Sequence, residues 1–570
     1  MSFPPPPNRR VLYIRHKRLV KISDLFRLNQ DEWVEALSAL ADVTVMTEDF
    51  DLDEVCDRIQ PDFILYESPP IHAAPLNITN PAAHPAIPRI GFLMQDPHCS
   101  SRVHFLRLID ELNIQWLFTH MTEAALRQSP ELQARIFSVS LFFDDKVFYD
   151  YGLPKTFPVS VFGGFLAPEI YAWRAKAARV LPEHFPTFIY THPGYLQPTP
   201  RHAFAVTGEA YARMLNQSAF SLADTTRLDC LVRKHLEIPA SGAVLIAPDT
   251  PVLKPYGFRD MENCLLGEGD ALFDKIAAVA DDPEMYEKIR KNGYDLVHSR
   301  YSRKHWRGIL DFYECLRNLK AGETVQQQGV LGPFKAMEKI PSPPSWGEMG
   351  RACPVLDTGV RGAVESPTMT PPSPHPPKEE GSDLPAIAAT YPDSVISAQL
   401  RSWLGRILGN ESLDEISDEI LKIPDWLFHM MEEWVLLGII AALKGDMPHA
   451  TEFFLAGQSL RKKLTGYTDY DPEEIAWLSL IAAMTGNAAL LDMTRREAAG
   501  MQHLSLRRIA WLGNILASGG DASNPPPEAL HRQPNDRLSI HWTGQLKMRE
   551  WLGLIERILA ANGAANMIRI

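Results

Sequence analysis

The residues best suited to chemistry lie in the charged segment 233–237. This segment begins a helical stretch that ends at Gly242. The pattern predicts a short helix followed by an apolar strand. In an α/β sheet this order brings Arg233, Lys234 and Glu237 near a crevice at the sheet edge, where ligands bind. Glu237 can accept hydrogen bonds from both hydroxyls of a ribose, and the two bases can neutralise a diphosphate. This combination suits a sugar nucleotide.

The elements that must position these residues form two series of strands and helices. Apolar strands alternating with helices predict parallel, doubly wound sheets. The first series spans residues 9–157 and the second 158–320, so the fold class is α/β with two Rossmann-like domains. The strands expected in the first series lie at 10–14, 43–46, 61–66, 90–94 and 116–120; a strand at 159–164 opens the second.

The remainder of the chain has a different character. Residues 321–393 carry clusters of proline with glycine, serine and glutamate, and few apolar residues to bury. This composition predicts a disordered or polyproline-like linker. Residues 394–570 read as an all-α domain.

A repeat runs through the helical region. The sequence Ile-Ala-Trp-Leu starts at Ile475 and again at Ile509, 34 residues later. An earlier unit holds Gly438 and is followed by Phe454. Small residues that let antiparallel helices pack closely at this period are typical of tetratricopeptide (TPR) repeats. The region resembles a short, irregular TPR-like solenoid, and an unrelated helical bundle is the alternative.

Composition excludes several classes of function. The 570 residues carry a net charge of −13, so there is no basic excess for general nucleic-acid binding. No apolar window is long enough to predict a transmembrane segment, and the proline-rich start does not resemble a signal peptide. The six cysteines are scattered without CxxC pairs, which predicts reduced thiols and a cytoplasmic location.

An ordered series of motifs carries a family resemblance. The segment from Lys234 to Gly242 is followed by Glu262-Asn263, by Asp282-Pro283-Glu284, and by an ending whose residues are Gly293, His298, Tyr301 and Arg303. This order resembles the donor-binding half of GT-B glycosyltransferases of group 1, in the branch with spore-maturation CgeB-like proteins. The resemblance covers roughly residues 9–318 and is strongest from about residue 190.

The resemblance implies two domains that face a cleft, with the acceptor on the first and a nucleotide-sugar donor on the second. It implies that Glu237 contacts the ribose and that Asn216 and Ser218 belong to the donor half. Retaining members often carry a second glutamate eight positions earlier, where this chain has Asp229. The alternatives are a surface pair of Arg233 with Glu237 and a helix N-terminal acid at Asp229.

Further candidates follow from their positions after strands. Lys254 and His192 are candidates for the donor phosphates or base. On the acceptor side, Asp96 or His98 is the candidate base if the reaction inverts, and Asp96 is equally well explained by a turn. GT-B enzymes are thought to stabilise the diphosphate with basic groups and a helix N-terminus rather than a metal. We therefore expect no metal and no cofactor beyond the donor substrate.

The leading hypothesis is a glycosyltransferase that moves a sugar from a nucleotide to a polysaccharide or protein acceptor. The TPR-like region would recruit a protein partner. A GT-B scaffold without chemistry, acting in binding or assembly, is the second hypothesis, and Asp229 in place of glutamate keeps it open. A sugar-nucleotide epimerase is a third. The donor base, the sugar, the acceptor and the stereochemical outcome are left open.

Overall fold

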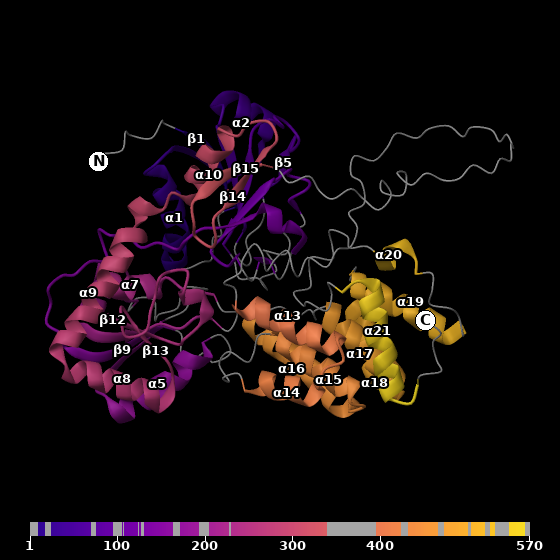
Figure 1. Ribbon diagram of the computed structural model, residues 1–570. Helices are drawn as coiled ribbons and strands as arrows, with labels where there is room; N and C mark the ends of the chain where they lie inside the picture. Colours follow the sequence, from indigo (N-terminus) through magenta and orange to yellow (C-terminus); the bar gives the residue numbers. More distant parts are fainter. Residues whose placement is uncertain are drawn as a thin grey trace.

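The computed structural model in Figure 1 shows two α/β domains and a separate block of helices. It describes residues 9–17, 24–69, 76–94, 105–106, 108–122, 125–126, 130–163, 171–192, 205–226, 230–338, 395–422, 431–465, 472–499, 503–518, 525–530 and 546–564.

The first α/β domain is built on a parallel sheet in the order β2-β1-β4-β6-β7-β8. Strands β4 and β6 are buried along their whole length, because helices and loops cover both faces of a doubly wound sheet. The strands confirm the five predicted for this series and add a sixth. They are β1 (Arg10–Ile14), β2 (Asp42–Met46), β4 (Phe63–Glu67), β6 (Arg89–Leu93), β7 (Trp116–Thr119) and β8 (Ile136–Ser138).

Two helices and a small strand pair also belong to the described part of this domain. Helix α1 (Asp24–Ser38) connects β1 to β2. Helix α2 (Leu52–Ile59) begins at Asp51, whose carboxylate accepts the backbone N–H groups of Asp53 and Glu54. Asp51 thus supplies the N-cap that an exposed helix start needs. The strand pair is β3 (Phe50–Asp51) with β5 (Ile78–Thr79), and a 3-10 turn, η1, spans Pro130–Arg135.

The second α/β domain holds a five-stranded parallel sheet in the order β10-β9-β11-β12-β13. The strand predicted at 159–164 is β9, which confirms the second start of the sequence pattern. The strands are β9 (Phe157–Gly163), β10 (Thr187–Thr191), β11 (Ser218–Leu222), β12 (Val244–Ala247) and β13 (Leu265–Leu266). The helices are α5 (Ala172–His184), α6 (Gly208–Asn216), α7 (Lys234–Ala240), α8 (Gly269–Asp281) and α9 (Pro283–Arg300).

Helix α10 (Gly308–Arg317) returns to the first domain. The Phe312 ring packs 5.2 Å from Phe118 of β7 and 5.0 Å from Phe137 of β8. At the other end of the sheet, Arg9 pairs with Glu314 at 2.8 Å. The chain therefore crosses between the domains twice, which limits how they move apart.

The start of the predicted linker requires a correction. Residues within 321–393 form an antiparallel hairpin of β14 (Glu323–Gln327) and β15 (Phe334–Glu338). The Gln327 side chain accepts from the backbone and hydroxyl of Ser138 in β8, and the Phe334 ring packs 5.5 Å from Phe312. The proline clusters that suggested disorder begin only after this hairpin. Residues 339–394 lie outside the described residues.

The C-terminal region is helical, as predicted. Consecutive helices pack as pairs: α15 (Met431–Leu443) with α16 (Met447–Thr465), and α17 (Pro472–Thr485) with α18 (Ala488–Ala498). A Cβ atom at Gly438 would lie 2.7 Å from the Phe454 ring, so the glycine permits the close approach of the first pair. The remaining helices are α13 (Val395–Leu408), α14 (Leu413–Leu421), α19 (Leu504–Ser518), α20 (Pro527–Leu530) and α21 (Met548–Ala561).

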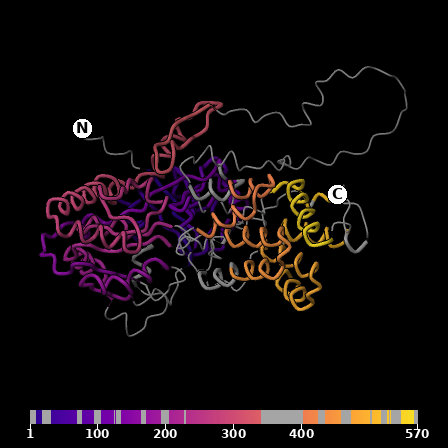
Figure 2. The backbone as a smooth tube through the Cα atoms, turned by 60° about the horizontal axis from the view of Figure 1, so that its bottom comes forward, coloured from indigo at the N-terminus to yellow at the C-terminus, as the bar shows by residue number. Residues whose placement is uncertain are grey.

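Figures 1 and 2 both place this helical block to one side of the α/β domains. Buried apolar side chains of the first domain and of the helical block belong to one continuous cluster, with Leu106 and Trp403 among its members. Among the described residues, none of the helices has the length and apolar character needed to cross a membrane.

Candidate functional site

The second sheet has its topological switch point between β9 and β11. From β9 the chain moves first to β10 on one side and then to β11 on the other. The carboxyl ends of β9 and β11 meet at this point, which in α/β proteins is where ligands bind. Gly163 ends β9, and Asp224 follows the last residue of β11 after one alanine.

A buried ion pair sits at this switch point. Arg174, on the first turn of α5, lies with its Nε 3.2 Å from the Asp224 carboxylate, and both side chains are buried. The Arg174 backbone N–H also donates to Asp224, and its guanidinium donates to the Phe162 carbonyl at 3.2 Å. Burial raises the pKa of Asp224, and the charge of Arg174 opposes that effect. The pair fixes the carboxyl end of β11 against α5.

Gly163 makes room for this arrangement. A Cβ atom at this position would lie 2.5 Å from Arg174 Nη1 and 3.4 Å from Lys234 Nζ. Its backbone φ of +128° is also unfavourable for any residue with a side chain. The side chains of Arg174 and Lys234 thus approach the backbone of Gly163 where β9 ends.

Lys234 is the first residue of α7 and supplies the ammonium at this edge. Its side chain is half-buried and, in the described part of the chain, forms no hydrogen bond or ion pair. Burial lowers the pKa of Lys234 to about 8, with a further decrease from the charge of Arg174. The charges of Glu237 and Asp224 oppose this decrease. A desolvated ammonium that forms no ion pair among the described residues is a group that an anionic ligand can neutralise.

Glu237 lies one helical turn beyond Lys234, on the same face. Burial raises the pKa of the Glu237 carboxyl, and the charges of Lys234 and Arg233 counteract the shift. Within the described residues its carboxylate accepts no side-chain or backbone hydrogen bond, and Arg233 pairs with Glu32, so the alternative of a surface ion pair between Arg233 and Glu237 is not formed. Lys234 and Glu237 thus present one cationic and one anionic group, both available to a ligand.

Arg233 is directed elsewhere. Its guanidinium forms an ion pair with Glu32 of α1 and lies 5.3 Å from the ring centres of both Trp33 and Phe142. Burial lowers the pKa of Arg233 to about 10. The sequence placed Arg233 at the diphosphate, but in this conformation it contacts the first domain. The position of a residue along the chain predicts the edge of the sheet at which it lies. The direction of its side chain depends also on the partners that the other domain supplies.

The other predicted donor residues are divided between the two ends of the sheet. His192 follows β10, with its backbone N–H 3.5 Å from the Gly163 carbonyl, and is therefore near the switch point. Lys254 lies exposed on the loop after β12, at the same end of the sheet.

Asn216 and Ser218 lie at the opposite end, just before and at the start of β11. Asn216 donates to Asp150 and to the Ser241 carbonyl, and Ser218 donates to the Met214 carbonyl. The structure does not bring these two residues to the candidate site, because parallel strands all begin at the same edge. Asp229, Asp96 and His98 lie outside the described residues.

Sequence reasoning did not identify the buried Asp224 as part of the site. The signal available was its position directly after the apolar end of a buried strand, where a charged residue needs a partner.

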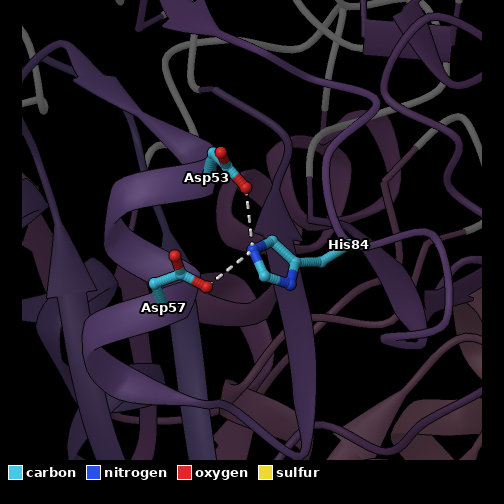
Figure 3. Close-up of side chains that lie close together, drawn as sticks. All are labelled: Asp53, Asp57 and His84. Carbon is cyan, nitrogen blue, oxygen red and sulfur yellow. Dashed lines mark ion pairs between the residues drawn. The ribbon is translucent and has the colours of Figure 1, made fainter.

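A cluster of possible metal ligands lies on other elements (Figure 3). His84 Nε2 is 3.0 Å from Asp53 and 3.4 Å from Asp57, one turn apart on α2. The two carboxylates are 58% and 75% exposed. The contacts describe a surface ion pair, and we assign no ion to it.

Comparison with known proteins supports the nature of the second domain. Residues 121–310 match the family model described as glycosyl transferase-like. The chain therefore carries a glycosyl transferase-like domain, which includes the switch point and α7. No curated protein matched the chain.

Three solved structures align with about half of this chain at low identity. The sucrose-phosphate synthase of Thermosynechococcus elongatus aligns with 12% identity over 54% of this chain and 99% of its own, at a TM-score of 0.38. The Anabaena protein Alr3699/HepE, in complex with UDP and glucose, aligns with 10% identity over 55% of this chain and 100% of its own, at a TM-score of 0.34. A glycosyltransferase from Rickettsia africae gives 10% identity, 55% and 99% coverage, and a TM-score of 0.34. Likenesses at this level carry no conclusion about substrate.

Proposed function

We propose that this protein is a glycosyltransferase that moves a sugar from a nucleoside-diphosphate donor to a glycan or protein acceptor. The observation that carries the proposal is the pair Lys234 and Glu237 at the switch point of a glycosyl transferase-like domain. Both groups lack side-chain partners within the described residues, and they differ in charge. A nucleotide sugar offers the complementary groups, a diphosphate and a ribose diol.

The roles follow from the chemistry of each side chain. Lys234 neutralises charge on the diphosphate as the bond to the sugar breaks. Glu237 accepts hydrogen bonds from the ribose hydroxyls. The Arg174–Asp224 pair contacts neither group directly and positions the crevice wall. With a protein cation at the leaving group, the reaction needs no metal, and we propose that it is metal-independent.

The helical region is proposed to recruit a protein partner. The close helix pairing at Gly438 is compatible with the TPR-like interpretation, whose repeats bind peptides and helices. A cytoplasmic location is proposed on the basis of the scattered cysteines, of which Cys56, Cys230, Cys264 and Cys315 are free thiols.

One observation favours the second candidate function, a scaffold without transfer activity. Arg233 is held by Glu32 and two aromatic rings rather than directed to the switch point. If that contact is permanent, one predicted phosphate-binding group is lost.

The experiment that separates the two functions is a nucleotide panel of UDP, GDP, ADP, CMP and dTDP. The readout is the thermal stability of the wild type, Lys234→Met and Glu237→Ala. A nucleotide at a hundred times its dissociation constant stabilises the fold by about 2.7 kcal/mol. We expect one nucleotide to raise the melting temperature of the wild type and to lose this effect in both variants.

Lys288→Met and Glu284→Gln provide matched controls, because both side chains are exposed on α9. They should respond to nucleotide as the wild type does. No shift with any nucleotide would favour the scaffold function.

A further inference from the structure

The first sheet has a switch point of its own, between β1 and β4. From β1 the chain goes to β2 on one side and then to β4 on the other. Ile14 of β1 is in register with Tyr66 of β4, so Arg15 and Glu67 are adjacent where the two strands end. As in the second sheet, this is where a ligand binds in an open α/β sheet.

A buried carboxylate lies at this switch point. The Glu67 side chain is completely buried, with its Oε2 accepting from the Tyr13 hydroxyl at 2.8 Å and lying 3.3 Å from Arg15 Nε. Arg15 is also paired with Asp31 of α1 at 2.8 Å. Half of the carboxylate is therefore held rigidly by groups of the protein.

The other half is not satisfied. Glu67 Oε1 and His16 Nδ1 are both buried, and neither has a hydrogen-bond partner within the described structure. They lie 3.9 Å apart, beyond hydrogen-bond distance. Burial lowers the pKa of His16 to about 4, so the imidazole is neutral at physiological pH. Two buried polar atoms without partners are rare in native proteins, and they indicate a missing ligand group or water.

The chemistry of the gap selects a hydroxyl group. The negative charge of Glu67 excludes an anion. The charge of Glu67 is already balanced by Arg15, so the site does not attract an ammonium group. A hydroxyl group can donate a hydrogen bond to the Glu67 carboxylate and accept a second one from His16 Nδ1–H. Sugars and polyols present such groups, and so do serine and threonine side chains.

The two switch points are linked through α1. Asp31 pairs with Arg15 at the first, and the next residue, Glu32, pairs with Arg233, which precedes α7 and adjoins Lys234 at the second. Two neighbouring residues of α1 therefore contact one switch point and the residue next to Lys234 at the other.

We propose that Glu67 and His16 bind the acceptor hydroxyl, and that the Glu67 carboxylate accepts its proton during transfer. The acceptor oxygen forms a bond to the donor sugar carbon, the bond from that carbon to the diphosphate oxygen breaks, and the electron pair leaves with the nucleoside diphosphate. The proton passes to Glu67. This inference rests on the proposed function and adds the acceptor-side catalytic residue to it.

The decisive variant is Glu67→Gln, which keeps the size of the side chain and removes the base. The full chain is tested for nucleotide binding by calorimetry, and for release of nucleoside diphosphate from UDP-, GDP- and ADP-glucose with glycerol as the hydroxyl probe. Loss of a general base lowers turnover by about 100-fold or more. We expect that loss together with unchanged nucleotide affinity.

Asp62→Asn is the matched control. Asp62 precedes β4 at the opposite end of the strand that Glu67 ends, and it accepts hydrogen bonds from Arg10 and Tyr313. The substitution Asp62→Asn removes one carboxylate from the same sheet and leaves the switch point unchanged. Turnover should therefore stay within about twofold of the wild type, as expected for a distant site.

A pH profile separates a base from a structural group. The charged and titratable groups facing Glu67 are Tyr13, Arg15, His16 and Asp31, and burial raises its pKa above the ordinary value. Turnover of the wild type should fall as the pH drops through that pKa, because a protonated carboxyl group accepts no proton. Glu67→Gln should lack this acid limb. If it does not fold, His16→Asn leaves the Glu67–Arg15 pair intact and should raise the KM for glycerol.

Each remaining outcome decides against a specific claim. If Glu67→Gln and His16→Asn bind nucleotide and keep the turnover of the wild type, the catalytic role of Glu67 is overturned and the proposed function stands. Nucleotide binding without any glycerol-dependent release in the wild type also overturns that role. If the wild type binds no nucleotide, the proposed function fails, and this inference fails with it.

Discussion

The Glu32 carboxylate of α1 forms an ion pair with the guanidinium of Arg233, the residue just before α7, and this contact joins the two α/β domains beside the candidate donor site. Trp33 and Phe142 flank the same guanidinium. Arg233 thus has two possible partners, the Glu32 carboxylate and a donor diphosphate.

Glu32→Gln should strengthen nucleotide binding, because it releases Arg233 to interact with the diphosphate. A partly exposed ion pair is worth about 1 kcal/mol or less, so we expect up to about a fivefold lower dissociation constant by calorimetry. Glu35→Gln is the control, since Glu35 pairs with Arg303 at 3.1 Å and not with Arg233. Weaker binding in Glu32→Gln would show that the pair with Arg233 is needed to form the site.

Nucleotide affinity should fall as the pH rises through the pKa of Lys234. Burial lowers that pKa to about 8, so the ammonium that attracts the diphosphate is present below this pH and is lost above it. Titrations at a series of pH values should show affinity declining from neutral to alkaline solution. Lys234→Met should bind more weakly throughout and lack this alkaline decline. An identical decline in Lys234→Met would assign the effect to another group.

Gly163→Ala should destabilise the second domain more than Gly152→Ala does. Both glycines have a positive φ, but a Cβ atom at Gly163 would meet Arg174 Nη1 at 2.5 Å, whereas nothing lies within 4 Å at Gly152. Backbone strain costs about 1–3 kcal/mol at either position, and the contact with Arg174 adds to it only at Gly163. Denaturant unfolding of the two variants measures the difference. Equal losses would mean that Arg174 moves away without cost.

Gly438→Ala should destabilise the helical region, because its Cβ would lie 2.7 Å from the Phe454 ring. Overpacking of this kind typically costs about 1–3 kcal/mol. Gly405→Ala, on α13 with nothing within 4 Å of its Cβ, should be neutral or stabilising by up to about 1 kcal/mol. Adding Phe454→Leu should restore part of the stability lost in Gly438→Ala, and circular dichroism melts would show it. Without that recovery, the contact is not the cause.

The sequence predicted the architecture well where local patterns are strong. Apolar runs of strand length, such as the one that ends at Glu67, identified five strands of the first sheet, and β9 and β12 of the second. The segment from Lys234 to Gly242 was correctly placed as a helix with Gly242 after its end, where φ is +72°. The hairpin within 323–338 was missed because its contacts with Ser138 and Phe312 are distant in sequence.

The candidate site was predictable only in part. Sequence alone determined which residue types follow the ends of buried strands and begin α7, because backbone periodicity fixes the edge of the sheet at which each residue emerges. Asn216 and Ser218 show the limit, since the motif that named them did not distinguish the two ends of β11.

Only the tertiary structure decided which side chains are left without partners. Arg233 and Lys234 are neighbours of the same charge, yet one is paired with Glu32 of the other domain and the other is not paired within the described residues. Glu67 and His16 are 51 residues apart, and their polar atoms come within 3.9 Å only because β1 and β4 are adjacent in the sheet. Strand order and domain packing set such distances, and neither is encoded in local periodicity.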